Sequence, residues 1–151
     1  MKKIKVSFIG CGRIFEKHLS AIRANKSLFE IDAICDKNLK NIQKHNISKH
    51  IKIFKTINSL LKSSNSDIYV ILTPSGFHYD HILKVGKLKK NILTEKPMVM
   101  NYDQCVKLKK FLKKGKINLY VVKQNRFNPA IKKLKEAMVK KRFGKVFLAT
   151  I

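Results

Sequence analysis

The chain has 151 residues, 44% of them hydrophobic, which is enough to bury the core of one domain. No apolar run approaches the roughly 18 residues of a membrane-spanning helix, and no leader peptide precedes the first strand, so we expect a cytoplasmic protein. Three cysteines, Cys11, Cys35 and Cys105, lack metal-type spacing and are typical of free thiols in a reducing compartment. Composition therefore predicts neither a membrane partner nor a metal site.

Lys and Arg number 34 against 9 Asp and Glu, a formal charge of +25. Such a charge can indicate a nucleic-acid partner. However, only four of the 34 basic residues are arginine, and the lysines are scattered along the whole chain with no aromatic–basic motif. We interpret the charge as compositional drift towards lysine, and a basic nucleic-acid-binding protein remains the alternative.

Apolar runs alternate with helical patterns along the chain, an order that predicts a parallel sheet covered by helices on both faces. Expected strands span residues 5–10, 30–35, 51–54, 67–72, 91–94, 119–122 and 145–151, and expected helices span residues 13–24, 37–45, 57–61, 78–88 and 101–115, with a further helix opened by Pro129. The expected fold class is α/β, a doubly wound, mainly parallel Rossmann sheet. Because the chain stops within an apolar strand, we expect the front part of a longer protein.

A glycine turn, Gly10-Cys11-Gly12, joins the first strand to the first helix. Phosphates bind at helix N-termini where N–H groups are free and the backbone can come close. Gly10 allows the tight turn, Gly12 allows close approach, and Arg13 and Ile14 open the helix. Phe15 stands where the usual pattern has its third glycine. Alone, this turn is weak evidence for a nucleotide site, and Cys11 is interpreted as a small residue that fits it rather than a reactive thiol.

Asp36 ends the second strand, 24 residues after Gly12. A carboxylate at this place accepts hydrogen bonds from the ribose hydroxyls of a dinucleotide. It would repel a ribose phosphate, which favours NAD over NADP, although Lys37 beside it weakens that preference. The other interpretation of Asp36 is a simple turn residue.

Two more strands end in polar loops at the same expected edge of the sheet, where ligands of doubly wound sheets bind. Thr73-Pro74-Ser75 follows one strand, and His78 lies five residues past Thr73. Spacing leaves two roles open for His78: packing at the helix start, or contact with the nicotinamide ribose. His18, on the first helix, is interpreted as a packed, hydrogen-bonded histidine.

Glu95-Lys96-Pro97 follows the next strand. Pro97 favours an extended backbone at Lys96, which aims that side chain off the sheet. An amine held there could hydrogen-bond a substrate hydroxyl or help remove its proton. In a chain so rich in lysine, a single lysine proves little.

Together these motifs resemble the N-terminal domain of the glucose–fructose oxidoreductase and inositol dehydrogenase family, Gfo/Idh/MocA. The resemblance covers essentially all 151 residues, and Glu95-Lys96-Pro97 is its most specific part. It implies an NAD cofactor, an active-site role for Lys96, and a second domain with most of the substrate contacts and a further catalytic residue. It also implies that Phe15 at the place of the third glycine is no departure from the family pattern, because the family tolerates other residues there.

The segment Val121–Pro129 resembles the branch of that family that oxidises UDP-N-acetylglucosaminuronate to its 3-keto form, in bacterial surface-polysaccharide synthesis. The resemblance implies that Gln124, Asn125 and Arg126 lie near cofactor or substrate. The other interpretation is a domain crossover packed by its apolar residues.

The expected organisation is an NAD-binding domain over residues 1–124, followed by a crossover helix and the first strand of an incomplete α+β substrate domain over residues 125–151. The leading hypothesis is an NAD-dependent dehydrogenase of a nucleotide-sugar hydroxyl, homo-oligomeric when full length, with Lys96 catalytic. The expected cofactor site comprises Gly10, Cys11, Gly12, Arg13, Ile14, Asp36, Thr73, Pro74, Ser75, His78, Glu95, Lys96, Gln124, Asn125 and Arg126. The alternative is a truncated, non-catalytic dinucleotide-binding module.

Overall fold

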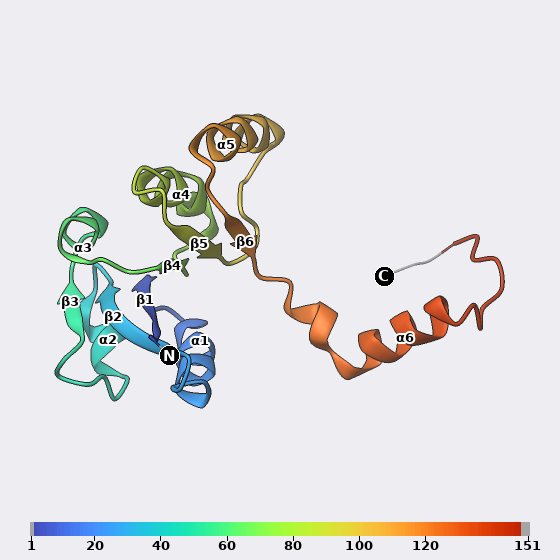
Figure 1. The fold of residues 1–151 in the computed structure, drawn as a ribbon, viewed down its shortest axis with the longest axis horizontal. Helices are drawn as coiled ribbons and strands as arrows, with labels where there is room; N and C mark the ends of the chain where they lie inside the picture. Colours follow the sequence, from blue (N-terminus) through green and yellow to red (C-terminus); the bar gives the residue numbers. More distant parts are fainter. Residues whose placement is uncertain (1, 149–151) are drawn as a thin grey trace.

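A computed structural model describes residues 2–148 and shows one six-stranded sheet in which every neighbouring pair is parallel (Figure 1). The strand order is β3-β2-β1-β4-β5-β6. The strands are β1 (Ile4–Ile9), β2 (Phe29–Cys35), β3 (Lys52–Phe54), β4 (Ile68–Ile71), β5 (Asn91–Thr94) and β6 (Leu119–Val121). The chain winds outward from β1 in one direction and then, from β4, in the other. The doubly wound parallel sheet is confirmed, and its switch point lies between β1 and β4.

The helices fall close to their expected positions: α1 (Phe15–Ala24), α2 (Leu39–Gln43), α3 (Ile57–Ser63), α4 (His78–Gly86), α5 (Tyr102–Gly115) and α6 (Pro129–Val139), with short 3₁₀ turns η1 (Ser75–Phe77) and η2 (Gln124–Phe127). Asn101 caps α5, since its side chain accepts a hydrogen bond from the Gln104 N–H at 2.9 Å. Among residues 2–148, no helix is long and apolar enough to cross a bilayer.

Two separate apolar clusters cover the two faces of the sheet, as the alternating pattern predicts. Phe8 of β1 packs with Phe15 of α1, their rings edge to face at 5.2 Å, on the side that also holds α2. Ile71 of β4 packs with Ile82 of α4 and Leu108 of α5 on the other side. Each fully buried side chain of this size contributes about 1.5–3 kcal/mol. The clusters fix the helices, and hence the loops at the strand ends.

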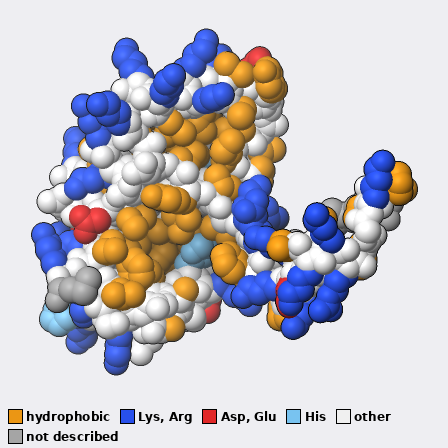
Figure 2. Space-filling model, turned by 45° about the vertical axis from the view of Figure 1, so that its right-hand side comes forward, with side chains coloured by type: hydrophobic (Ala, Val, Ile, Leu, Met, Phe, Trp, Pro, Cys, Tyr) orange, Lys and Arg blue, Asp and Glu red, His pale blue; other side chains and the backbone are white. Residues whose placement is uncertain are grey.

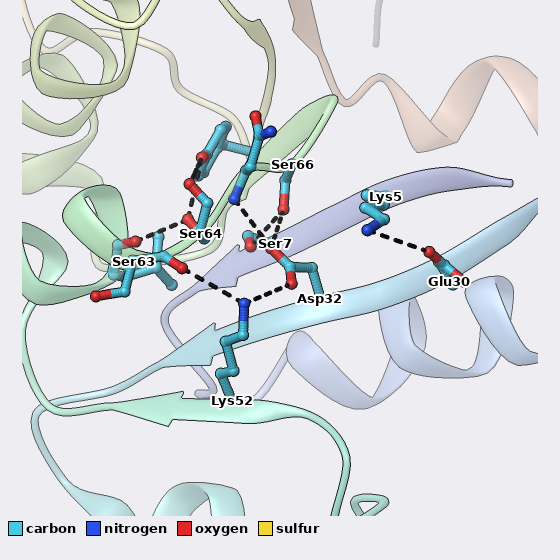
Figure 3. Close-up of polar contacts among 11 residues, drawn as sticks. Lys5, Ser7, Glu30, Asp32, Lys52, Ser63, Ser64 and Ser66 are labelled. Atoms are coloured by element: carbon cyan, nitrogen blue, oxygen red, sulfur yellow. Dashed lines mark hydrogen bonds and ion pairs between the residues drawn. The ribbon is translucent and has the colours of Figure 1, made fainter.

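A polar cluster lies beside the middle of β1 and joins this strand to the segment before β4 (Figure 3). The Ser7 and Ser66 hydroxyls, both fully buried, are 2.7 Å apart. Ser66 donates in turn to Asp32 Oδ2 at 3.1 Å, and Lys52 pairs with the other Asp32 oxygen at 3.4 Å. The cluster ties β1, β2, β3 and the start of β4 together through satisfied polar groups.

The expected strand over residues 145–151 is wrong for its described part, because no strand forms up to Leu148; residues 149–151 lie outside the described residues. A strand needs a neighbour for its N–H and C=O groups, and no sheet edge lies beside this segment. Phe147 and Leu148 are 84% and 81% exposed. Helix α6 forms as expected, but it stands apart from the sheet with Leu134 exposed on its apolar side (Figure 1).

Candidate functional site

A cleft of about 830 Å³ opens at the carboxyl ends of the strands, across the switch point between β1 and β4. Hydrophobic side chains gather beside a histidine on the face of the body shown in Figure 2, while Lys and Arg are spread widely around them. Twelve of the fifteen residues expected to bind the cofactor line this cleft: Gly10, Gly12, Arg13, Ile14, Asp36, Thr73, Pro74, Ser75, His78, Glu95, Lys96 and Gln124.

The two positions of the turn, Gly10 and Gly12, favour glycine for different structural reasons. Gly10 has a φ of +95°, and a Cβ added there would lie 2.8 Å from the Thr73 backbone nitrogen. Both the positive φ and the close approach of the chain after β4 therefore require glycine. A Cβ added at Gly12 would meet nothing within 4 Å. Gly12 thus leaves open space in the cleft wall, as a site for a closely approaching phosphate needs.

The N-terminus of α1 faces this turn, and no side chain of the described residues caps it. The Phe15 and Lys17 N–H groups donate to the Gly12 and Ile14 carbonyl groups, and the positive end of the helix dipole can attract an anion here. Phe15, at the place of the usual third glycine, is fully buried. It joins helix to sheet by filling space against Phe8 rather than by letting the two backbones touch.

Asp36 lies at one end of the cleft and is held by three hydrogen bonds. Its Oδ2 accepts from the Cys11 backbone N–H at 2.7 Å. Its Oδ1 accepts from the Asn38 N–H at 2.8 Å and from Asn41 Nδ2 at 3.3 Å. The carboxylate is thereby oriented, with lone pairs left for further donors such as ribose hydroxyls.

Cys11 does not line the cleft, although the expected site included it; its side chain is buried and its contribution is the backbone N–H to Asp36. Burial, with the Asp36 charge, raises the pKa of the Cys11 thiol well above its usual range. The same causes raise the pKa of Cys35 to about 11. Because only the thiolate is a strong nucleophile, both thiols are inert near neutral pH.

Glu95 joins the loop after β5 to helix α1. His18 Nε2 donates to Glu95 Oε1 at 3.0 Å, and the two side chains are only 16% and 13% exposed. The other Glu95 oxygen accepts from the Lys96 backbone N–H at 3.2 Å. His18 is thus a packed, hydrogen-bonded residue, and the Lys96 side chain is exposed in the cleft.

His78 is 1% exposed, and its ring contacts two backbone oxygens, Thr73 O and Pro97 O, each at 2.6 Å. The ring thus packs at the start of α4, one of the two roles that the spacing left open. His78 also lines the cleft, and its contact with the nicotinamide ribose stays a prediction.

Sequence reasoning missed several residues of the cleft. His81, one helical turn after His78, shares a hydrogen bond with the Thr73 hydroxyl at 3.0 Å and stacks on Phe77 at 5.9 Å. Burial, with Lys84 nearby, lowers the pKa of His81 below its usual range. The three-residue spacing from a predicted cleft residue, on the same helix face, was the available signal. Other cleft residues not foreseen as ligands are Lys37, Asn41, Lys55 and Ile57.

The expected set Gln124, Asn125 and Arg126 is divided. Gln124 lines the cleft. Arg126 instead lines a shallow hollow on α6 with Phe127 and Lys132, and Asn125 lines neither. The structure brings one of the three to the strand ends.

Residues 4–123 match the family described as "Oxidoreductase family, NAD-binding Rossmann fold", GFO_IDH_MocA. The rhizopine catabolism protein MocA of Rhizobium meliloti is 25% identical over 99% of this chain and 47% of its own length. The myo-inositol 2-dehydrogenase of Thermotoga maritima is 25% identical over 94% of this chain and 42% of its own. The chain thus spans less than half the length of these relatives.

Among solved structures, the WlbA dehydrogenase of Bordetella pertussis, in complex with NADH and UDP-GlcNAcA, superposes with a TM-score of 0.89 at 31% identity. The match covers 97% of this chain and 45% of that one. The family match contains the glycine turn, Asp36 and the Glu95-Lys96-Pro97 loop, which the fold places around one cleft. The chain therefore belongs to the Gfo/Idh/MocA oxidoreductase family, and residues 4–123 are its NAD-binding Rossmann domain.

Proposed function

We propose that this chain is the cofactor-binding part of a dehydrogenase that uses NAD to oxidise a hydroxyl of a nucleotide sugar, with UDP-N-acetylglucosaminuronate as the substrate class. The observation that carries the proposal is the single cleft in which the glycine turn, Asp36 and Lys96 meet. The 31% identity to WlbA, solved with NADH and UDP-GlcNAcA, supports the choice of substrate.

The cleft residues fit a dinucleotide at both ends. The pyrophosphate would lie over Gly12 and the uncapped start of α1, where a Cβ would point into open space. The adenosine ribose would donate to Asp36, whose charge disfavours a ribose phosphate and so favours NAD over NADP. The nicotinamide end would lie towards Thr73, Glu95 and Lys96.

Lys96 supplies the polar chemistry at the reacting carbon. When bound, NAD takes up the hydride that leaves the carbon of the reacting hydroxyl. The exposed Lys96 amine would hydrogen-bond that hydroxyl and help remove its proton. Glu95 fixes the backbone of Lys96 through the 3.2 Å hydrogen bond from the Lys96 N–H, so the amine projects from a held loop.

The rest of the proposed site belongs to a second domain. Residues 1–124 form the NAD-binding domain, and residues 125–151 lead into a substrate domain that holds the sugar and adds a further catalytic residue. The coverage of less than half of each relative supports this organisation. We propose that the complete protein is cytoplasmic, acts in surface-polysaccharide synthesis and forms a homo-oligomer, with neither nucleic acid nor membrane as a partner.

The substrate is tested with the complete natural protein, NAD and UDP-N-acetylglucosaminuronate. The expected result is growth of the NADH absorbance together with a product two mass units lighter than the substrate, the 3-keto sugar. Myo-inositol serves as the comparison substrate, because a relative is an inositol dehydrogenase. Turnover of inositol with none of the nucleotide sugar rejects the proposed substrate.

A second candidate, a dinucleotide-binding module that performs no catalysis by itself, is favoured by the same coverage. It predicts that the 151-residue chain binds NADH but turns over no sugar, whatever the complete protein does. Turnover by the 151-residue chain alone rejects it.

A further inference from the structure

His78 joins two loops that approach each other from neighbouring strands. Its Nδ1 lies 2.6 Å from the Pro97 carbonyl oxygen, beyond β5, and its Nε2 lies 2.6 Å from the Thr73 carbonyl oxygen, beyond β4. The residue is only 1% exposed, so bulk water does not compete for either nitrogen. Both distances are slightly shorter than the usual range of about 2.7–3.2 Å for N–H···O hydrogen bonds.

Both partners of the ring are carbonyl oxygens, which accept hydrogen bonds and never donate them. A neutral imidazole has one N–H and one lone pair, so its bare nitrogen would face a carbonyl lone pair at 2.6 Å. The doubly protonated ring donates from both nitrogens, and charged donors make shorter and stronger hydrogen bonds. We propose that His78 carries both ring protons at neutral pH and, as a cation, acts as a positioning residue that ties the Thr73 loop to the Lys96–Pro97 loop.

Several other ionisable groups lie on the elements around His78. The ionisable groups that follow His78 on α4 are Tyr79, Asp80, His81 and Lys84, and the loop beyond β5 carries Glu95 and Lys96. Burial and then Lys84 lower the pKa of His81, whereas Asp80 raises it to a smaller degree. The dipoles of the two carbonyl groups beside His78 can stabilise a charge on its ring in place of water.

The consequence for Lys96 rests on the proposed function, whereas the protonation state of His78 does not. Lys96 has a held residue on each side: Glu95, bonded to His18, and Pro97, bonded to His78. Two helices, α1 and α4, therefore fix the loop that carries the amine. A displacement of about 1 Å at a reacting group can cost a large factor in rate, so loosening one side should lower turnover more than cofactor binding.

The protonation state is tested in the 151-residue chain itself by long-range ¹H–¹⁵N correlation spectra at pH 7. The chain has five histidines. Changing His18, His45, His50 and His81 to Gln one at a time assigns the remaining ring without altering His78. The expected result is two protonated ring nitrogens with similar ¹⁵N shifts. Two widely separated ¹⁵N shifts, the mark of one neutral tautomer, would overturn the proposal.

The positioning role is tested in the complete natural protein with His78→Gln, with His50→Gln at an exposed turn as the matched control. The expected result is a fall in kcat of about tenfold or more, a larger factor than the change in the NADH dissociation constant. Unchanged kcat for His78→Gln, in a protein that Lys96→Met inactivates, overturns the positioning role. Full activity of Lys96→Met overturns the proposed function instead.

Discussion

The carboxylate of Asp36 accepts a hydrogen bond from the backbone N–H of Cys11 at 2.7 Å. Asp36, which is proposed to bind the ribose hydroxyls, therefore also holds the glycine turn proposed to face the pyrophosphate. One side chain at the end of β2 couples the two halves of the cofactor site across the end of β1.

Because of this coupling, Asp36→Ala should weaken the binding of NADH. The variant loses the ribose acceptor and releases the turn, so NADH affinity should fall by about tenfold or more, on the order of 1.4 kcal/mol. Calorimetric titration of NADH measures it, with Asp103→Ala on the exposed first turn of α5 as the control. NADPH should lose less than NADH; an equal loss of both would contradict the proposed discrimination against a ribose phosphate.

The two glycines of the turn should separate stability from binding. Gly10→Ala forces a residue at φ +95° with its Cβ 2.8 Å from the Thr73 nitrogen, and should cost about 2–4 kcal/mol in urea unfolding. Gly12→Ala meets no atom within 4 Å and should change the free energy of unfolding by less than about 1 kcal/mol. Its NADH affinity should nevertheless fall, because its methyl group enters the space proposed for the pyrophosphate. Unchanged NADH affinity for Gly12→Ala would place the phosphates elsewhere.

The buried serine pair should respond as a unit. Ser66→Ala leaves the Ser7 hydroxyl, which is fully buried, without its partner at 2.7 Å and should destabilise the chain by about 1–3 kcal/mol. Adding Ser7→Ala should cost less than the sum of the single changes, because the unpaired hydroxyl is gone. Exposed Ser20→Ala is the control, expected within about 0.5 kcal/mol. Additive losses in the double variant would contradict the pairing.

The thiols predict how stability depends on alkaline pH. The pKa of Cys35 is raised from 9.0 to about 11, so the folded chain keeps this proton where the unfolded chain releases it. Between pH 9 and about 11 the folded state therefore binds more protons than the unfolded state. The free energy of unfolding should fall as pH rises through that window. Urea unfolding at pH 8, 9 and 10 should show a shallower fall for Cys35→Ala than for the unaltered chain, since the lysines titrate in both. Parallel curves would contradict the raised value.

The sheet and most of the cleft followed from local signals in the chain. Apolar strands alternating with amphipathic helices allow few topologies, and in each of them the strand ends meet at one edge. Gly10, Asp36, Thr73 and Lys96 could thus be assigned to one site because each lies at or just beyond the carboxyl end of an expected strand. His18 was expected to be packed and hydrogen-bonded, and its bond to Glu95 agrees.

Other features depend on tertiary contacts that a single sequence does not show. The two partners of His78 are backbone oxygens of distant loops, and no side-chain pattern identifies a backbone acceptor. The strand expected at residues 145–151 was inferred from apolar density alone, but its described part has no neighbour to pair with. Arg126 was placed at the cleft by resemblance, whereas the short turn η2 carries it towards α6.

Lys96 is proposed to support sugar oxidation from the cofactor cleft, and Lys96→Met in the complete natural protein removes the amine that would do so. Met has a similar length without the amine, and the Lys96 side chain is exposed, so folding and NADH binding should persist. We expect kcat with UDP-N-acetylglucosaminuronate to fall by a factor on the order of 100 or more, while Lys90→Met, near the opposite end of β5, retains activity. Full turnover by Lys96→Met would contradict the proposed role of the amine.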